Sequence, residues 1–265
     1  MAKQKPSYFR EDFLMRESYS MWYILGLLAD TYIPLRDNNK GVIFRNRRLE
    51  VVEIVRNALG CNNAIVHDNR GKNSYSLELT NRKLRLQLEE RGLTPRKADR
   101  RFPENIDDIF VSHYIRGFVE EKSGGWRRDD IVRRIRLSKF NIEYLKALNK
   151  LLEERCGVKR KKITRDEVVY NVDDSISIFD FIYREEGLYI PKIKDRFRLI
   201  KKEKLKKTEM KWIERKEKIM SLLREGIHPS EICKILGYKN IKSLNASFFY
   251  QTGQTLNGFR RSFGT

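Results

Sequence analysis

The expected order of helices and strands repeats itself along this chain. In the first copy, an apolar helix ending near residue 30 leads into a hairpin, a second helix, a second hairpin and a third helix. The same order begins again at Ile106. Turn residues between short apolar runs indicate the hairpins, and apolar residues at helical spacing indicate the helices. A repeat of about 90 residues predicts two similar halves around a pseudo-twofold axis. The expected fold class is α+β, with the strands of both halves forming one long saddle.

The excess of basic residues constrains the partner. The chain has 56 Lys and Arg against 36 Asp and Glu, which gives a formal net charge of +20. Spread-out cations bind a polyanion by releasing its condensed counterions, so nucleic acid is the expected partner. A charge that serves solubility alone is the alternative, although solubility rarely calls for so one-sided a balance.

Basic residues are expected on one side of the strands. Ile135 and Leu137 alternate with Arg134 and Arg136, so the two arginines lie on the face opposite the apolar pair. Val158–Lys162 adds four positive charges in the next strand or its entry. The expected DNA-contacting residues of the two halves are Arg36, Arg45, His67, Arg127, Arg128, Arg134, Arg136, Lys159 and Lys161.

Cysteine and histidine residues are too scattered for several kinds of chemistry. Cys61, Cys156 and Cys233 form no CxxC pair and are expected to be reduced core residues. The three histidines are equally scattered, which argues against a zinc cluster and against a hydrolase with a His base. The beginning of the sequence lacks the apolar run of a signal peptide, and no stretch reaches roughly 18 apolar residues. A cytoplasmic, nucleoid-associated location is therefore expected.

The ends of the two opening helices carry a family resemblance. "MWYILGLLAD" and "HYIRGFVEEKSG" match at Gly26 and Gly117, and a strand, a helix and a "GLTPRK" turn lie between them. A third segment, "SISIFDFIYREEGLYIPKIKDRFRLI", follows the second motif. In this order, residues 9–200 resemble the LAGLIDADG homing endonuclease family. The resemblance implies that the two helices pack against each other through Gly26 and Gly117, and that the saddle lies in the DNA major groove.

The same resemblance implies an acid at the foot of each helix, where two carboxylates would hold magnesium ions against the scissile phosphates. Aligned on the motif glycines, these positions hold Thr31 and Lys122, which predict a protein that does not cleave. Asp30 and Glu121 lie one residue earlier, a rotation of about 100° on a helix. They are expected to be solvated or salt-bridged helix ends beside Lys122. No catalytic residue, metal or cofactor is therefore expected. The alternative is an active magnesium-dependent endonuclease that uses Asp30 and Glu121.

The C-terminal segment predicts a second kind of DNA-binding domain. Pro229 and Ser230 begin a short helix, Gly237 lies in a turn, and another helix begins near Ile241. With "LGY" in the turn, this stretch resembles the AraC-type helix-turn-helix. Its expected core residues are Ile232, Ile235, Leu244 and Phe248. The residues expected to face DNA are Lys239, Asn240, Lys242, Ser243, Asn245, Ser247 and Tyr250. A three-helix bundle used only for dimerisation is the alternative.

Together these patterns predict four segments. LAGLIDADG-like repeats span 1–105 and 106–200, a basic helical linker spans 201–225, and a helix-turn-helix domain spans 226–265. WhiA-type regulators have a similar domain pairing. The expected function is sequence-specific binding of double-stranded DNA by a transcriptional regulator derived from a homing endonuclease. An active nuclease and an RNA-binding intron maturase are the alternatives, and a homodimer through or on the helix-turn-helix domain stays open.

Overall fold

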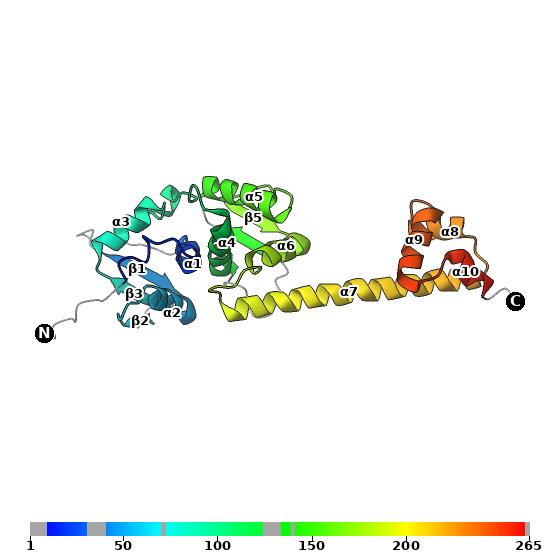
Figure 1. The fold of residues 1–265 in the computed structure, drawn as a ribbon, viewed down its shortest axis with the longest axis horizontal. Helices are drawn as coiled ribbons and strands as arrows, with labels where there is room; N and C mark the ends of the chain where they lie inside the picture. Colours follow the sequence, from blue (N-terminus) through cyan, green and yellow to red (C-terminus); the bar gives the residue numbers. More distant parts are fainter. Residues whose placement is uncertain (1–9, 31–40, 70–72, 124–133, 139–140, 263–265) are drawn as a thin grey trace. The chain divides into compact units, whose positions relative to one another are not determined.

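The computed structural model describes residues 10–30, 41–69, 73–123, 134–138 and 141–262. The chain divides into two compact units, 1–200 and 201–265, and a single long helix, α7 (Pro191–Arg224), crosses the boundary. The first unit is α+β, and the described part of the second is helical (Figure 1). None of the helices in these ranges combines the length and apolar character that a membrane span requires.

The first unit contains two successive sets of helices and strands (Figure 1). The first set is α1 (Tyr19–Leu28), β1 (Val42–Asn46), α2 (Leu49–Ala58), β2 (Ile65–Asp68), β3 (Ser74–Leu79) and α3 (Arg82–Glu90). A short 3-10 helix (Lys97–Asp99) lies in the connection between the sets. The second set is α4 (Asp108–Ser123), β4 (Ile135–Ser138), α5 (Ile142–Cys156), β5 (Glu167–Tyr170) and α6 (Val172–Ile182).

The strands form two small antiparallel sheets. The first has the order β1-β3-β2, and the second pairs β4 with β5. One face of each sheet is buried: Phe44 lies opposite Leu77, and Leu137 lies opposite Val168. Side chains alternate between the two faces of a strand, so the neighbouring residues point outward. Helix α2 contacts β1 and β3, whereas α4 contacts β4 and α6 contacts β5.

The structure bears on two of the strand predictions. Val158–Lys162 is the entry to the next strand and is not itself a strand; the isolated bridge between Thr164 and Glu167 follows it, where β5 begins. Val158 is buried, so this segment packs against the core instead of extending the sheet. The described strands form two sheets, and one long saddle made by both stays a prediction. The first strand of the opening hairpin in each half was expected within 31–40 and 124–133, which lie outside the described residues.

Helices α1 and α4 pack directly against each other at the centre of the first unit (Figure 1). Every side chain from Met21 to Leu28 is buried, as expected for a helix that is apolar all round. The two backbones meet at glycines. A Cβ atom on Gly26 would lie 2.1 Å from the carbonyl oxygen of Tyr114, and one on Gly117 would lie 2.1 Å from that of Tyr23. Only glycine permits this approach, and these are the two positions that the sequence singles out.

The second unit is a small helical core. Helices α8 (Pro229–Leu236), α9 (Ile241–Thr252) and α10 (Leu256–Arg261) pack with the last turns of α7. The buried residues are Ile219, Leu222, Leu223, Ile232, Cys233, Leu244, Phe248, Leu256 and Phe259. The segment 201–225 was expected to be a separate linker, but its last turns contribute three of these side chains and so belong to the core.

The turn between α8 and α9 follows the predicted positions. Pro229 begins α8, Gly237 ends it in the left-handed region at φ 68°, and Ile241 begins α9. One predicted core residue is wrong: Ile235 is 56% exposed. The buried side of α8 runs through Ile232 and Cys233, and Ile235 points away from it. Cys233 and the part-buried Cys61 and Cys156 are all free thiols.

Candidate functional site

The acids at the feet of the two central helices are bonded to side chains from the opposite half. Lys122, at the end of α4, lies 2.8 Å from a carboxylate oxygen of Asp30, just beyond α1. Its side chain is 8% exposed and that of Asp30 is 18% exposed. This ion pair joins the C-terminal ends of α1 and α4. Asp30 is thus a salt-bridged helix end, as the sequence predicts, and the neighbouring Thr31 lies outside the described residues.

Glu121 is held in the same way by the first half. Arg48 Nη2 lies 2.9 Å from Glu121 Oε2, and Asn46 Nδ2 donates to the same oxygen at 2.8 Å. The same Arg48 nitrogen also donates to the carbonyl oxygens of Glu120 and Glu121. A cation that bonds the last carbonyls of a helix also offsets the negative end of its dipole. Arg48 therefore neutralises the acid and the helix end together.

Charged groups are concentrated at the C-terminal ends of α1 and α4. Burial raises the pKa of Glu121; the Arg48 guanidinium opposes the rise, and the nearby Asp30 carboxylate adds to it. Arg100 supplies a third cation, since its buried guanidinium donates to the carbonyl oxygen of Ala29 at 2.7 Å. Burial lowers the pKa of Arg100, and Asp30 opposes that change. Two carboxylates therefore lie among three cations.

This arrangement does not suit the magnesium ion that the resemblance implies. Magnesium needs carboxylate oxygens free to complete an octahedral shell. Here an ammonium already bonds Asp30 and a guanidinium already bonds Glu121. A divalent ion would have to displace both and would lie beside fixed positive charges. In the described ranges, no group of His, Cys, Asp and Glu side chains has the composition of a metal site.

Glu120 is a buried acid that the sequence did not single out. The Tyr23 hydroxyl donates to its Oε2 at 2.6 Å, the backbone N–H of Ile190 donates to Oε2 at 2.9 Å, and the Tyr183 hydroxyl donates to Oε1. Burial raises the pKa of Glu120 to about 7, although the three hydrogen bonds and Arg116 act against the rise. Its three hydrogen-bond partners lie on α1 and in the connection between α6 and α7, far from it in the sequence, so no local pattern marks it.

Arg116 fixes the connection between α6 and α7, the segment that also contains Tyr183 and Ile190. Its guanidinium donates to the carbonyl oxygens of Ile182 at 2.6 Å, Glu185 at 2.6 Å and Leu188 at 3.0 Å. With Glu120 one turn further along α4, it holds the chain that leads into α7. Arg116 and Glu120 therefore connect the central helix pair to the start of the long helix.

The exposed faces of both sheets carry predicted arginines. Arg45 is exposed opposite Ser76, and Arg134 and Arg136 are exposed at the start of the second sheet. Arg136 Nε lies 3.4 Å from Glu167, but the Arg136 side chain remains 65% exposed. An exposed ion pair of this kind is weak. These three arginines are therefore open to a polyanion.

Three other predicted contacts lie elsewhere. His67 is exposed, but it is stacked on Tyr75, and its Nε2 lies 2.5 Å from Asn73 Oδ1. Since opposed residues share a face, His67 lies on the side of the core residues and not beside Arg45. Lys161 is 2.5 Å from Asp174 and has a side chain only 23% exposed, whereas Lys159 is exposed. Arg36, Arg127 and Arg128 lie outside the described residues.

Most of the predicted polar contacts on α9 are engaged inside the second unit. Asn240 and Ser243 form the capping box at the start of the helix. Asn245 accepts from the backbone N–H of Leu256 at 2.9 Å, and Ser247 lies 3.3 Å from the Tyr238 hydroxyl. These four side chains stabilise the unit. The remaining predicted residues, Lys239, Lys242 and Tyr250, are exposed.

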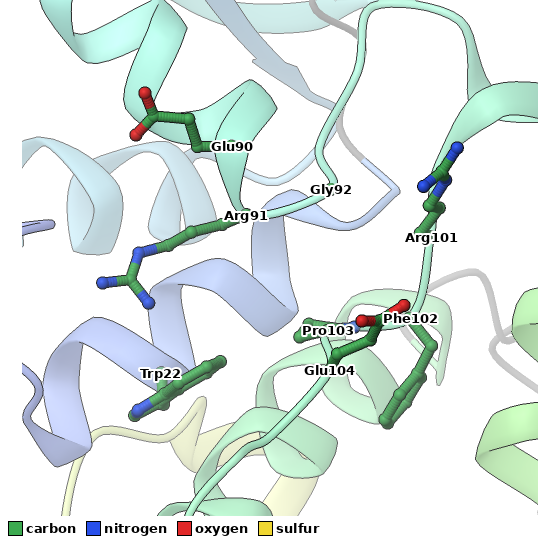
Figure 2. A pocket seen from close by; sticks show the side chains of 8 residues that line it. All are labelled: Trp22, Glu90, Arg91, Gly92, Arg101, Phe102, Pro103 and Glu104. Carbon is green, nitrogen blue, oxygen red and sulfur yellow. The ribbon is translucent and has the colours of Figure 1, made fainter.

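A pocket of about 290 Å³ lies beside the connection between the two halves. Its lining residues are Trp22, Glu90, Arg91, Gly92, Arg101, Phe102, Pro103 and Glu104 (Figure 2). The Arg91 guanidinium lies 5.5 Å from the centre of the Trp22 ring and donates to the Leu14 carbonyl oxygen at 2.8 Å. Figure 2 shows the charged ends of Glu90 and Arg101 well apart. Because the polar groups do not converge, this pocket has the character of a packing gap.

Removing the Lys122 ammonium should destabilise the first unit. Lys122→Met leaves the part-buried charge of Asp30 without its close ion pair, so we expect a loss of about 2 kcal/mol in the free energy of unfolding, measured by urea titration. Adding Asp30→Asn should recover at least half of that loss. The control is Lys146→Met, which removes an exposed pair with Glu143 and should change little. Equal losses with and without Asp30→Asn would contradict this pairing.

The raised pKa of Glu120 predicts a specific pH dependence. The acid is protonated in the folded chain up to about pH 7, but only up to about pH 4.5 when unfolded. The folded state binds the extra proton between these values, so the contribution of Glu120 to stability falls as pH rises through this window, by up to about 3 kcal/mol. Unfolding in urea across pH 4.5–8 should be less pH-dependent in Glu120→Gln than in the parent. The exposed Glu143→Gln is the control, and parallel curves for Glu120→Gln and the parent would refute the shift.

The residues of this chain alone define the candidate site. No protein-family model matches the chain, and no curated protein matches it in sequence. The features that bear on function are the bonded acids Asp30 and Glu121, the exposed sheet arginines and the exposed side of α9.

Proposed function

We propose that this chain is a sequence-specific double-stranded DNA-binding protein, a transcriptional regulator whose first unit derives from a LAGLIDADG homing endonuclease that has lost cleavage. The observation that carries the loss of cleavage is the pair of ion pairs at the foot of the central helices. Lys122 bonds Asp30, and Arg48 bonds Glu121. A fixed cation thus bonds one oxygen of each carboxylate, and a divalent ion would have to compete with both cations.

Binding to DNA is supported by charge and by shape. The net charge of +20 favours a polyanion, and Arg45, Arg134 and Arg136 are exposed on the sheets. In the second unit, α8, a tight turn and α9 have the spacing of a helix-turn-helix, in which the second helix enters the major groove. Two kinds of DNA contact on one chain favour a long, bipartite site.

Selection from random duplex DNA in the presence of magnesium tests this function. We expect the full chain to enrich one bipartite duplex and to leave its ends intact, because Asp30 and Glu121 are already bonded to cations. Sequencing the recovered ends measures cleavage directly. Cuts that require magnesium and disappear in Asp30→Asn would establish a nuclease in place of a regulator. Displacement of the duplex by structured RNA at lower concentration would favour the maturase.

The sheet arginines should determine part of the affinity. Arg134→Ala with Arg136→Ala removes two phosphate contacts, so binding of the selected duplex should weaken and the slope of log K against log salt should flatten by about 2. Fluorescence anisotropy over a range of salt concentrations measures both quantities. Arg155→Ala, which removes an arginine bonded to Asp108 on another part of the unit, is the control. Unchanged affinity and slope in the double variant would place the DNA away from this sheet.

A further inference from the structure

The outward side of α9 is more apolar than a polar base-reading surface would be. Lys242, Ala246, Phe249 and Tyr250 are spaced so that they lie on one side of the helix, and all four are exposed. Phe249 is 52% exposed and Tyr250 is 85% exposed. We call these four residues the α9 stripe. Two large aromatic side chains on so small a unit indicate a contact surface.

The Asn and Ser side chains near the stripe are committed to bonds within the unit. Asn240 and Ser243 cap the helix, and Asn245 holds the backbone of Leu256. Within the stripe, the polar atoms are the ammonium of Lys242 and the hydroxyl of Tyr250. Adenine is commonly recognised by the side-chain amide of Asn or Gln, and the α9 stripe contains neither residue. The methyl group of Ala246 and the rings of Phe249 and Tyr250 offer apolar contact instead.

Charge favours DNA over a second copy of this chain for this surface. Residues 201–265 hold 15 Lys and Arg against 6 Glu and no Asp. Lys239 and Lys242 lie at the start of α9, and both are exposed. A second copy of so basic a unit would be repelled, whereas a phosphate backbone would be attracted.

We propose that the α9 stripe reads thymine methyl groups in the major groove. The C5-methyl of thymine is the apolar group that the bases present there, and alanine and aromatic side chains are suited to contact it. Ala246, Phe249 and Tyr250 supply these contacts, while Lys242 holds a phosphate or a guanine edge. This inference rests on the proposed DNA binding and adds to it the base class that one part of the bipartite site contains.

Replacing thymine by deoxyuridine removes the methyl group and keeps the base pair. We therefore expect the selected duplex to contain a cluster of T·A pairs, and we expect affinity to fall when that cluster is made with deoxyuridine. Burial of each methyl corresponds to about fourfold in affinity, so two contacts predict a loss of about fifteenfold. Single substitutions along the site locate the positions that matter.

Two variants test whether the loss of affinity for deoxyuridine DNA arises at the α9 stripe. Phe249→Ala and Tyr250→Ala should each bind the thymine duplex more weakly and should respond less to deoxyuridine than the parent does. Met210→Ala, which truncates an exposed apolar side chain on α7, is the matched control and should keep the full response. Circular dichroism checks that the variants are folded, and the exposed positions make folding losses small.

Three other outcomes distinguish the methyl contact, the proposed DNA binding and self-association of the chain. Specific binding of a duplex with equal affinity for its thymine and deoxyuridine forms would overturn the methyl contact and leave the proposed function standing. Failure to enrich any duplex would instead overturn the proposed function itself. Altered self-association of Phe249→Ala and Tyr250→Ala in sedimentation, with unchanged DNA affinity, would make the stripe a contact between copies of this chain.

Discussion

The direct contact of backbones between α1 and α4 is the constraint on which the first unit depends. A Cβ on either Gly26 or Gly117 would lie 2.1 Å from a carbonyl oxygen of the other helix. Because the helices approach so closely, their C-terminal ends lie near each other. Each end carries the partial negative charge of its carbonyls and an acid beside it, Asp30 for α1 and Glu121 for α4. Close packing thus creates a concentration of negative charge.

Cations from across the crossing offset this charge. Lys122 reaches from α4 to Asp30, and Arg48 reaches from the first half to Glu121 and to the last carbonyls of α4. Arg100 does the same for the carbonyl of Ala29. Each bond joins residues from different helices or connections, so neutralising the foot also fixes how the two halves pack. A divalent ion at this place would have to replace several of these contacts at once.

Local patterns predict much of this fold, because helices and turns depend on neighbours in the sequence. Gly26 and Gly117 stand out within apolar helices, and Gly237 marks the turn before α9. The partner of Glu121 could not be predicted in this way, because Arg48 is 73 residues away from it. Glu120 has partners equally distant, and its role depends on burial, which no spacing reveals. The exposure of Ile235 has a related cause, since apolar character alone does not say which side of a short helix is covered.

The second unit has so small a core that polar side chains are needed to hold its helices together. Asn240 and Ser243 satisfy the first N–H groups of α9, and Asn245 satisfies the backbone where α10 begins. A side chain committed to such a bond would leave a buried or capped group unsatisfied if it turned toward DNA, at a cost of about 1–3 kcal/mol. Asn240 and Asn245 are therefore committed within the unit, and contacts of α9 with a partner fall to its other exposed side chains. The lysines among them attract every sequence alike, because phosphates carry no sequence information. Under the proposed DNA binding, discrimination between bases would then draw on the apolar surface of Ala246, Phe249 and Tyr250, whose contacts are sensitive to the presence of a single methyl group.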